Sequence, residues 1–367
     1  MSIAALRADA DSDRVLNLTR RFRAPRSRVW AAFTDPAELA RWWGPRGASC
    51  RRVEADVRPG GRYRIEMVSG EANVFVLEGE YREVRAPERL VYTWVWAQGG
   101  MAGFETVATL DFVAHGAETE LRVRHELFPD TRFRDLHNYG WGGGLDRLAA
   151  RIWQESDPRN VPVVYGVPPS NFTRTVRMAL AEKGLAHVLE PARPHTPEQA
   201  ARHPFGRIPA FIHGDVKLCE SFAICRYVDE ALPGPALQPA DPAARARMTQ
   251  WVSAAMDYLV DDFNRPIAFE RLAAPRFLGR PSDEVQIREA LPRAEATIRA
   301  FDAALAATGY FVGDTPTLAD LFAFPSMDYA AVVPDTAALV ASLPHLSAWL
   351  AKMRTRPSAR ETQAQFD

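Results

Sequence analysis

The chain has 367 residues, of which 47% are hydrophobic and 25% charged, and its formal net charge is −1. This length exceeds one ordinary hydrophobic core, so we expect two or three domains, and the balanced charge argues against nucleic acid as a partner. No window approaches about 18 uncharged apolar residues, so no membrane span is expected. Residues 1–13 lack a long apolar stretch, which argues against a signal peptide. Three cysteines are too few for a disulfide framework, which predicts a reducing, cytoplasmic compartment.

Residues 14 to about 155 predict an α+β domain. Alternation around Leu16 predicts an opening strand, and a helical pattern from Arg26 to Trp43 is interrupted at Asp35-Pro36. A turn at Pro59-Gly60-Gly61 then introduces several alternating runs, which predict strands. Their apolar positions are Tyr63, Ile65 and Met67; Tyr92, Trp94 and Trp96; Leu110 and Phe112; and Leu121, Val123 and His125.

A long helix from Arg132 to Trp153 is predicted to close this domain. Its apolar side carries Leu136, Leu145, Leu148 and Ile152. The run Gly142–Gly144 weakens the prediction, because each glycine in a helix costs about 1 kcal/mol relative to alanine. Glu105 and His125 are ionisable residues on predicted strands, but their positions identify no pair of nucleophile and base.

A polar segment with two prolines, residues 154–162, predicts a linker, and residues 163–230 then alternate strand and helix as in a βαβ unit. A strand ends at Tyr165 and a helix occupies about 171–184, so Ser170 lies at a helix N-terminus. Its hydroxyl can cap the helix. The same position suits an anion such as a thiolate, because a helix N-terminus carries roughly half a positive charge.

The last region, from about residue 240 after a proline-rich second linker, predicts only helices. Thr317 and Asp320 form a capping-box pattern, to which we assign a structural role. Three side chains could belong to the helical core or line a substrate pocket: Met256, Tyr258 and Phe263. The eight histidines show no spacing typical of metal ligands, so no metal is expected.

Several separated motifs make residues 162–365 resemble the glutathione S-transferases. They are Gly166-Val167-Pro168-Pro169-Ser170-Asn171-Phe172-Thr173-Arg174, Phe205-Gly206-Arg207-Ile208-Pro209, Glu220-Ser221 and Phe311–Asp320. The resemblance implies a thioredoxin-like α/β domain at 162–232, which binds glutathione, and an all-helical C-terminal domain at 240–365. The first motif resembles the serine-type enzymes, especially the phi class, in which the serine hydroxyl donates a hydrogen bond to the glutathione sulfur. Ser170 is then the catalytic residue.

The same resemblance implies how glutathione is held. Ile208-Pro209 matches a cis-proline turn whose backbone pairs with the cysteinyl part of the tripeptide. Glu220-Ser221 matches the pair that holds the glutamyl end, and Ser221 could also cap a helix. Arg207 stands where the phi pattern has glutamine, and it could grip the glycyl carboxylate. His195 lies near the place of another residue that contacts this carboxylate, although a plain surface histidine fits equally.

Three further residues lie in the part of the chain that resembles a transferase. One differs from the phi pattern, and two take no part in the transferase chemistry. His203 stands where the phi pattern has asparagine, so glutathione recognition can differ from that of the family. Cys219 and Cys225 flank the Glu-Ser pair, and we interpret both as small core residues.

Residues 14–155 resemble the SRPBCC superfamily, in the branch named after activators of the ATPase of the ninety-kilodalton heat-shock chaperone. The motifs are Trp30–Pro36, Trp42-Trp43-Gly44-Pro45, Pro59–Gly61, Pro87–Val91 and Gly140-Trp141. The resemblance implies a helix-grip fold, in which a curved antiparallel sheet holds a long helix, and an apolar cavity. Four tryptophans could line that cavity or form an ordinary core: Trp42, Trp43, Trp94 and Trp96.

The sequence as a whole predicts a multidomain α+β protein that uses glutathione as a co-substrate and conjugates it to small hydrophobic electrophiles, in detoxification or a stress response. The first domain would hold or present an apolar compound. The resemblance implies a homodimer, and neither nucleic acid nor membrane is expected as a partner. A non-catalytic protein that binds hydrophobic ligands, or a chaperone-associated module, stays open as an alternative.

Overall fold

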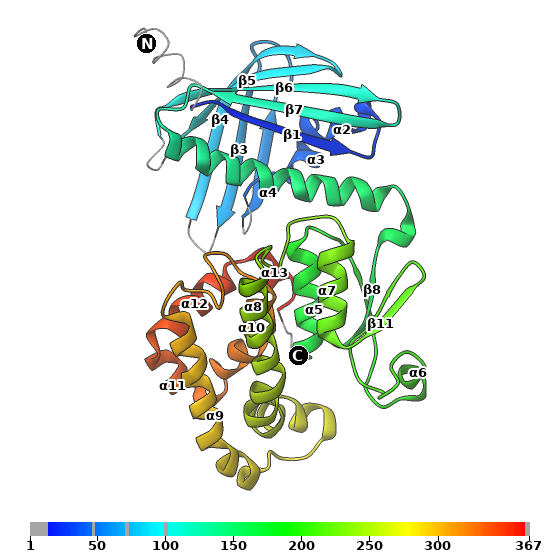
Figure 1. The fold of residues 1–367 in the computed structure, drawn as a ribbon, viewed down its shortest axis with the longest axis vertical. Helices are drawn as coiled ribbons and strands as arrows, with labels where there is room; N and C mark the ends of the chain where they lie inside the picture. Colours follow the sequence, from blue (N-terminus) through cyan, green and yellow to red (C-terminus); the bar gives the residue numbers. More distant parts are fainter. Residues whose placement is uncertain (1–13, 46–47, 70–72, 99–101, 364–367) are drawn as a thin grey trace. The chain divides into compact units, whose positions relative to one another are not determined.

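A computed structural model describes residues 14–45, 48–69, 73–98 and 102–363 (Figure 1). The segment considered as a signal peptide lies outside these residues. The chain divides into two compact units, the first made mainly of residues up to Asn160 and the second mainly of residues from Val161 onward. None of the helices within the described ranges is both long enough and apolar enough to cross a membrane.

The first unit is built on a seven-stranded antiparallel sheet in the order β1-β7-β6-β5-β4-β3-β2. Its strands are β1 (Leu16–Phe22), β2 (Ser49–Ala55), β3 (Arg62–Ser69), β4 (Asn73–Arg85), β5 (Arg89–Trp96), β6 (Glu105–His115) and β7 (Glu118–Glu126). The predicted turn at 59–61 joins β2 to β3, which pair antiparallel. β2 to β6 each pair with the next strand in the chain, whereas β1 pairs with the last strand of this sheet, β7.

Two short helices and one long helix cover the sheet: α2 (Arg26–Thr34), α3 (Pro36–Ala40) and α4 (Thr131–Glu155). Asp35 ends α2 and caps α3, because its carboxylate accepts the N–H of Ala37 at 2.8 Å, which confirms the predicted break. Figure 1 shows α4 running along one face of the sheet, and residues of both share one core. This is the helix-grip arrangement that the sequence predicts.

The long helix α4 differs from the prediction in two details. It continues through Gly142–Gly144 and ends at Glu155, so it includes the first two residues of the predicted linker. Leu145, Leu148 and Ile152 are buried as expected, but the prediction for Leu136 is wrong, because its side chain is 52% exposed. Leu136 lines a cavity beside the sheet instead of packing in the core.

Two strands, β2 and β4, escaped the sequence analysis, each for a physical reason. β2 is the edge strand of the sheet and consists mainly of exposed or half-buried polar residues, so it carries no apolar alternation. β4 contains a bulge between Tyr81 and Glu83, which shifts the side-chain alternation halfway along the strand.

The second unit begins with a four-stranded sheet in the order β11-β10-β8-β9. Its elements are β8 (Val163–Gly166), α5 (Asn171–Glu182), β9 (Val188–Pro191), α6 (Pro197–Ala200), β10 (Ala210–His213), β11 (Val216–Cys219) and α7 (Ser221–Ala231), after a 3-10 turn η1 (Pro158–Asn160). β8 and β9 are parallel and joined through α5, and β10 is antiparallel to both β8 and β11. This is the thioredoxin-like order that the sequence predicts.

Helices alone form the rest of the second unit within the described residues, as expected. They are α8 (Pro242–Ala254), η2 (Ala255–Leu278), α9 (Glu284–Leu305), α10 (Leu318–Ala330), α11 (Pro334–Ser342), α12 (Pro344–Arg354) and α13 (Pro357–Glu361). The wide, π-type helix η2 contains two prolines and ends at Gly279, whose φ of +64° suits a residue without a side chain. Nearly all of α10 is buried, so it is the centre of this bundle. The domain boundaries at 155, 162, 232 and 240 stay a prediction.

The predicted capping box at the start of α10 is present, and its carboxylate is fully buried. Asp320 accepts hydrogen bonds from the backbone N–H of Thr317 at 2.9 Å and of Phe311 at 3.3 Å, and from the indole N–H of Trp349 at 2.8 Å. Burial raises the pKa of Asp320 to about 6, while these donors lower it. The carboxylate is therefore ionised at neutral pH and joins three segments of the bundle.

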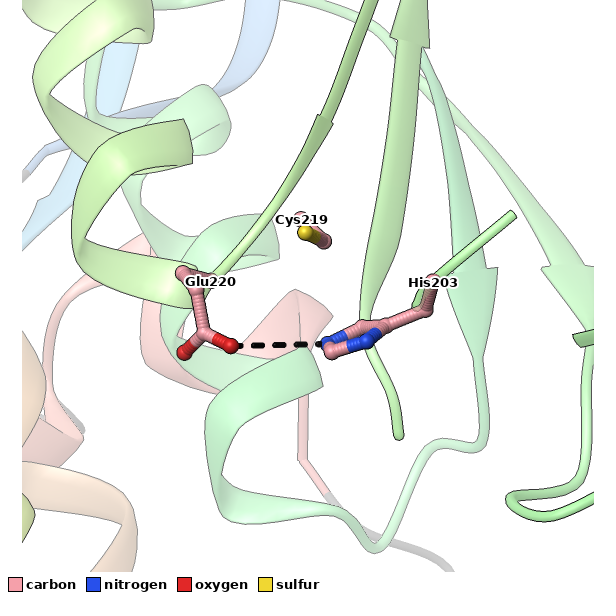
Figure 2. A group of neighbouring side chains, drawn as sticks. All are labelled: His203, Cys219 and Glu220. Atoms are coloured by element: carbon pink, nitrogen blue, oxygen red, sulfur yellow. Dashed lines mark ion pairs between the residues drawn. The ribbon is translucent and has the colours of Figure 1, made fainter. Parts of the chain in front are cut away.

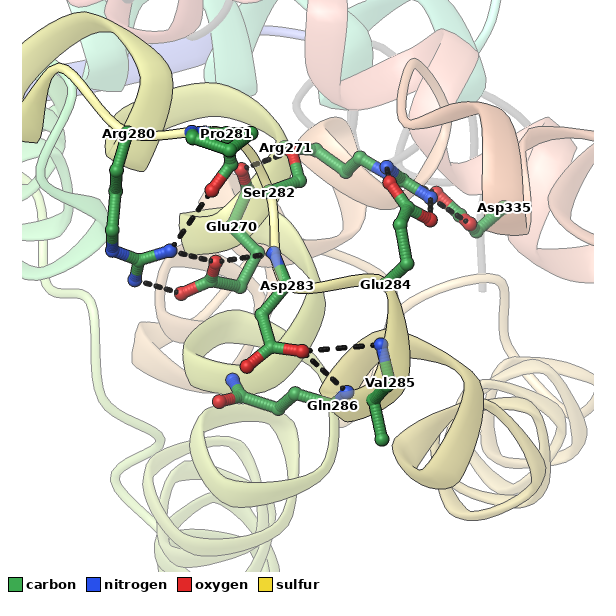
Figure 3. Close-up of polar contacts among 10 residues, drawn as sticks. All are labelled: Glu270, Arg271, Arg280, Pro281, Ser282, Asp283, Glu284, Val285, Gln286 and Asp335. Atoms are coloured by element: carbon green, nitrogen blue, oxygen red, sulfur yellow. Dashed lines mark hydrogen bonds and ion pairs between the residues drawn. The ribbon is translucent and has the colours of Figure 1, made fainter.

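A second carboxylate organises the turn between η2 and α9 (Figure 3). Glu270 is 2% exposed, and its two oxygens each lie 2.7 Å from a guanidinium nitrogen of Arg280. It also accepts the N–H of Asp283 at 2.9 Å. Next to it, Arg271 binds Asp335 of α11 at 2.7 Å. The hydrogen bond from Arg280 holds the pKa of Glu270 below its usual value.

The lowered pKa of Glu270 predicts how acid affects this turn. A carboxyl group with a depressed pKa in the folded state stabilises the fold above its ordinary pKa of 4.5 and loses this effect as the pH falls. We expect Glu270→Gln to lower the thermal midpoint by a few degrees at pH 7 and to have a progressively smaller effect as the pH falls below 4.5. Thermal unfolding of both proteins between pH 3 and 7 measures this, and a constant difference across that range would contradict it.

Candidate functional site

The strand register brings three predicted binding segments to one edge of the four-stranded sheet. β10 begins at Ala210, which pairs with Tyr165 near the end of β8 and with Cys219 at the end of β11. Because β10 is antiparallel to both neighbours, the segment after β8, the segment before β10 and the segment after β11 share that edge. These segments contain Ser170, Ile208-Pro209 and Glu220-Ser221.

Ser170 lies directly before α5 with a partly exposed side chain. Its Oγ accepts the N–H of Thr173 at 3.3 Å, so the predicted capping role is present. This contact uses an oxygen lone pair and leaves the O–H proton to be donated to another group. The residue before it, Pro169, is fixed from α10, because the Tyr329 hydroxyl donates to the Pro169 carbonyl at 2.7 Å. A hydroxyl donor at a helix N-terminus suits a thiolate.

Helix α5 is anchored to the helical bundle by a buried charge. Arg174 is 2% exposed, and its guanidinium lies 2.8 Å from the Asp328 carboxylate and 4.9 Å from the centre of the Phe324 ring. At the other end of α5, its last residue, Glu182, forms two hydrogen bonds of 2.6 Å with Arg356. The contacts of Arg174 hold the first turn of α5 next to Ser170, and those of Glu182 hold its last turn.

The Ile208–Pro209 peptide bond is cis, as the resemblance implies. Pro209 is buried, while the side chain of Arg207 is exposed to solvent. The Arg207 carbonyl accepts a hydrogen bond of 2.6 Å from the buried amide of Gln199, which ties the turn to α6. The Arg207 guanidinium is therefore accessible to a carboxylate.

Two of the predicted binding residues have a backbone conformation that is uncommon for residues with side chains. Among the described residues other than glycine, positive φ values occur at His195 (62°), Glu220 (66°) and Leu127 (69°). Such conformations cost of order 1–3 kcal/mol and cluster at ligand sites. The His195 N–H donates to the Gly206 carbonyl at 2.7 Å, which joins this exposed loop to the cis-proline segment.

Glu220 and Ser221 lie at the start of α7, but Ser221 does not occupy the cap position that the sequence analysis considered for it. Glu220 takes the cap position without a capping bond from its side chain, and Ser221 is the first residue of the helix. The capping alternative for Ser221 is therefore wrong. The Glu220 carboxylate is 54% exposed and can meet an ammonium group, while the N-terminus of α7 favours a carboxylate.

Figure 2 shows that His203 points toward Glu220, with Cys219 beside them. His203 is buried, its Nε2 lies 3.8 Å from Glu220 Oε1, and its Nδ1 accepts the N–H of Phe205 at 3.2 Å. The neutral ring therefore carries its proton on Nε2, directed at the carboxylate. The three side chains bring their ligating atoms within 4.8 Å of one another. Because a protonated Nε2 offers no lone pair, this arrangement suits an electrostatic contact with Glu220 at 3.8 Å better than a metal ion.

The two cysteines near this edge behave differently from each other. Cys225 is fully buried, as predicted, and burial raises the pKa of its thiol well above the usual value. The prediction that Cys219 is a core residue is wrong, because its side chain is only partly buried and lies beside His203.

Other candidates lie away from this edge. Phe263 is buried in the helical core, whereas Tyr258 is 60% exposed and lines a hollow of about 680 Å³ with residues of α8 and α9. In the first unit, a cavity of about 290 Å³ is lined by all four tryptophans that the sequence suggested: Trp42, Trp43, Trp94 and Trp96. Trp141 also lines it. The sequence analysis named Trp141 in a family motif but not as a cavity residue, because its place in the lining depends on how α4 packs.

Comparison with known proteins agrees with both units. Residues 23–152 match the family model of the Activator of Hsp90 ATPase homolog 1-like protein. Residues 164–236 match the Glutathione S-transferase, N-terminal domain, and residues 265–357 match the Glutathione S-transferase, C-terminal domain. Glutathione S-transferase 4 of Zea mays is 33% identical over 216 residues, which cover 55% of this chain and 92% of that protein.

Solved structures lead to the same family. Glutathione transferase F2 from Populus trichocarpa aligns with a TM-score of 0.51 at 28% identity, over 55% of this chain and 96% of that one. Glutathione S-transferase I from maize, in complex with an atrazine glutathione conjugate, aligns with a TM-score of 0.50 at 28% identity over the same shares. The chain therefore belongs to the glutathione S-transferase family and carries an Activator of Hsp90 ATPase homolog 1-like domain on the N-terminal side of its transferase part.

Proposed function

We propose that this protein conjugates glutathione to small hydrophobic electrophiles, with Ser170 as the catalytic residue. The observation that carries the proposal is the position of the Ser170 hydroxyl at the N-terminus of α5. The cis-proline turn and the Glu220-Ser221 pair lie at the same sheet edge. The maize relative in complex with an atrazine glutathione conjugate supports this class of reaction.

The proposed chemistry depends on the ionisation of the glutathione thiol. A free thiol has a pKa near 8.5, and only its thiolate is a strong nucleophile. The Ser170 hydroxyl donates a hydrogen bond to the sulfur, and the positive end of α5 adds a favourable field. Lowering the thiol pKa by about two units requires about 2.7 kcal/mol. The thiolate then forms a carbon–sulfur bond to the electrophile, and the leaving group departs with its electron pair.

The remaining site residues would hold the ends of the tripeptide. The backbone of Ile208 before Pro209 pairs with the cysteinyl part, and the Glu220 carboxylate pairs with the glutamyl ammonium. The glutamyl carboxylate then meets Ser221 and the N-terminus of α7. Arg207 and His195, both exposed on the loop beside the turn, bind the glycyl carboxylate.

We propose a separate role for the first unit, which would bind an apolar small molecule and raise its concentration near the transferase part. The cavity of about 290 Å³ supports a ligand role, and tethering gives effective concentrations of the order of millimolar.

The family resemblance and the exposed ring of Phe205, 68% accessible, support a homodimer. We place the protein in the cytoplasm, where glutathione keeps thiols reduced.

The experiment that tests the transferase function is a conjugation assay with glutathione and a chromogenic aryl halide, together with calorimetry of glutathione binding. We expect both turnover and binding. If neither is detected, the transferase proposal fails. Glutathione binding without turnover of any electrophile would favour the alternative of a non-catalytic binding protein.

His203 should act on glutathione binding through Glu220. We expect His203→Ala to raise the KM for glutathione up to about fivefold, because a polar contact with a partly exposed carboxylate contributes up to about 1 kcal/mol. The KM for the electrophile should not change. His203→Asn places the usual family residue at this position and should restore much of the affinity.

A double-mutant cycle separates this role from a structural one. If His203 orients the Glu220 carboxylate, then His203→Ala should have little further effect in a Glu220→Gln background. Additive effects of the two substitutions on the KM for glutathione would show that His203 acts independently of Glu220.

A further inference from the structure

The cavity of the first unit is bordered by an unusual aromatic lining. Five tryptophans contribute to it: Trp42, Trp43, Trp94, Trp96 and Trp141. The rings of Trp43, Trp94 and Trp141 lie with their centres 5.5 Å apart in tilted or edge-to-face pairs. Aromatic rings prefer such offset and edge contacts with one another, so this lining favours another aromatic ring as its occupant.

Glycines of α4 keep the cavity open. Gly140 and Gly144 are one helical turn apart and both line the cavity. A Cβ atom at Gly140 would meet no heavy atom within 4 Å, and one at Gly144 would lie 3.5 Å from the Trp42 ring. Each glycine costs the helix about 1 kcal/mol relative to alanine. Gly144, the last residue of the glycine run that weakens the helix prediction, and Gly140 before that run therefore leave room for a ligand.

Most polar ring atoms around the cavity are used inside the protein, but the indole Nε1–H of Trp94 is buried without a hydrogen-bond partner. The His137 Nδ1–H donates to the Phe133 carbonyl at 2.8 Å, and its Nε2 accepts the indole N–H of Trp96 at 3.1 Å. Trp141 donates its indole N–H to His125 Nδ1 at 3.2 Å. Burial lowers the pKa of both histidines, so both rings are neutral at neutral pH. These paired groups do not require a polar ligand, and the Trp94 N–H can donate to one neutral acceptor, such as a hydroxyl oxygen.

The lining also carries no ion-pair partner for a charged ligand. None of the described residues that line the cavity is an aspartate, glutamate, lysine or arginine. A charged group placed there would lose its hydration without an ion pair, which is unfavourable. The lining therefore selects a neutral compound.

The size of the cavity limits the ligand further. An apolar cavity of about 150 Å³ is known to hold benzene. The volume here, about 290 Å³, is about twice as large and accommodates two or three fused rings. Two large apolar side chains that line the cavity are themselves exposed, Phe75 by 43% and Leu136 by 52%, and they mark its open side.

We propose that this cavity binds a neutral, flat aromatic compound of two or three fused rings, which enters past Phe75 and Leu136. This inference rests on the proposed ligand role of the first unit and is independent of transferase activity. It assigns a chemical class that the family resemblance, which implies only an apolar cavity, leaves open.

The test is a titration of the full-length protein with 2-naphthol, followed by calorimetry and by tryptophan fluorescence. Five of the nine tryptophans line the cavity, so a ligand there should change the emission strongly. We expect a Kd of the order of 10 μM for a ligand of this size. Gly140→Leu should fill the cavity and weaken binding about tenfold.

Gly142→Leu is the matched control for the helix. It lies in the same turn of α4, also has open space around its Cβ position, and does not line the cavity. It should bind 2-naphthol within twofold of the wild type. Circular dichroism of both variants checks that α4 and the sheet are intact. Equal affinity of the wild type and Gly140→Leu would place the ligand elsewhere, including the transferase part, and overturn the inference.

Two comparison ligands and the transferase activity show which proposal has failed: the ligand class, the ligand role of the first unit or the transferase function. If 1-decanol or a naphthyl trimethylammonium salt binds more tightly than 2-naphthol, the aromatic, neutral class is wrong although the cavity binds ligands. If none of the three binds, the ligand role of the first unit is wrong as well. Turnover of the aryl halide by the wild type, measured in the same preparation, reports on the transferase proposal alone.

Discussion

Ser170→Ala should lower kcat/KM for glutathione conjugation tenfold to a hundredfold, equal to about 1.4–2.7 kcal/mol of transition-state stabilisation. The substitution removes the hydroxyl that would donate to the sulfur, while the N-terminus of α5 keeps its field. The thiol of bound glutathione should then ionise at a higher pH. The measurement is the pH profile of kcat/KM for both proteins, together with the ultraviolet absorbance of the bound thiolate.

A control is needed because Ser170 also caps α5, so alanine removes a capping bond that contributes about 1 kcal/mol to stability. Ser170→Thr keeps both the cap and the hydroxyl and should retain most activity. Ser170→Gly keeps a favourable cap residue without the hydroxyl and should be as inactive as the alanine variant. If alanine reduces kcat/KM less than twofold, or shifts activity only in proportion to stability, Ser170 is not the catalytic residue.

Asp320→Asn should destabilise the second unit by about 2–4 kcal/mol. Asparagine has the same shape, but its amide nitrogen replaces an oxygen that accepts hydrogen bonds. The replaced atom would then face N–H donors, either of Thr317 or of Phe311 and Trp349. Because these groups are buried, their lost bonds are not replaced by water.

Urea unfolding monitored by far-ultraviolet circular dichroism measures the change. Asp314→Asn is the matched control, since Asp314 is exposed in the same loop and should change stability by less than about 0.5 kcal/mol. An equal midpoint for Asp320→Asn and the wild type would show that the capping box contributes little to the bundle.

The local part of the fold could be read from the sequence because it depends on neighbouring residues. The capping box of Thr317 and Asp320 lies within four residues, and the break at Asp35-Pro36 rests on a capping side chain and a proline at the first position. The bulge in β4 could not be predicted, because it depends on pairing with β5 and leaves no mark on a single strand.

The site shows the same division between local and non-local information. Family motifs suggested Ser170 and the Glu220-Ser221 pair as candidates. A left-handed Glu220 takes the cap position of α7, so Ser221 is not the capping residue. His203 and Glu220 lie in two separate segments, before β10 and after β11, and the pairing of these strands brings the two side chains together. Its one sequence signal was the departure from the asparagine of the phi pattern.

The left-handed backbone of Glu220 and His195 has a consequence for the thermodynamics of binding. Both conformations are anchored within the fold, because the His195 N–H donates to the Gly206 carbonyl at 2.7 Å and Glu220 directly precedes α7, so the ordering of these loops belongs to folding. A tripeptide then meets a preorganised surface and loses little of its affinity to loop ordering. The site should therefore behave as a rigid template, whose affinity responds to changes in the ligand more than to changes in loop flexibility.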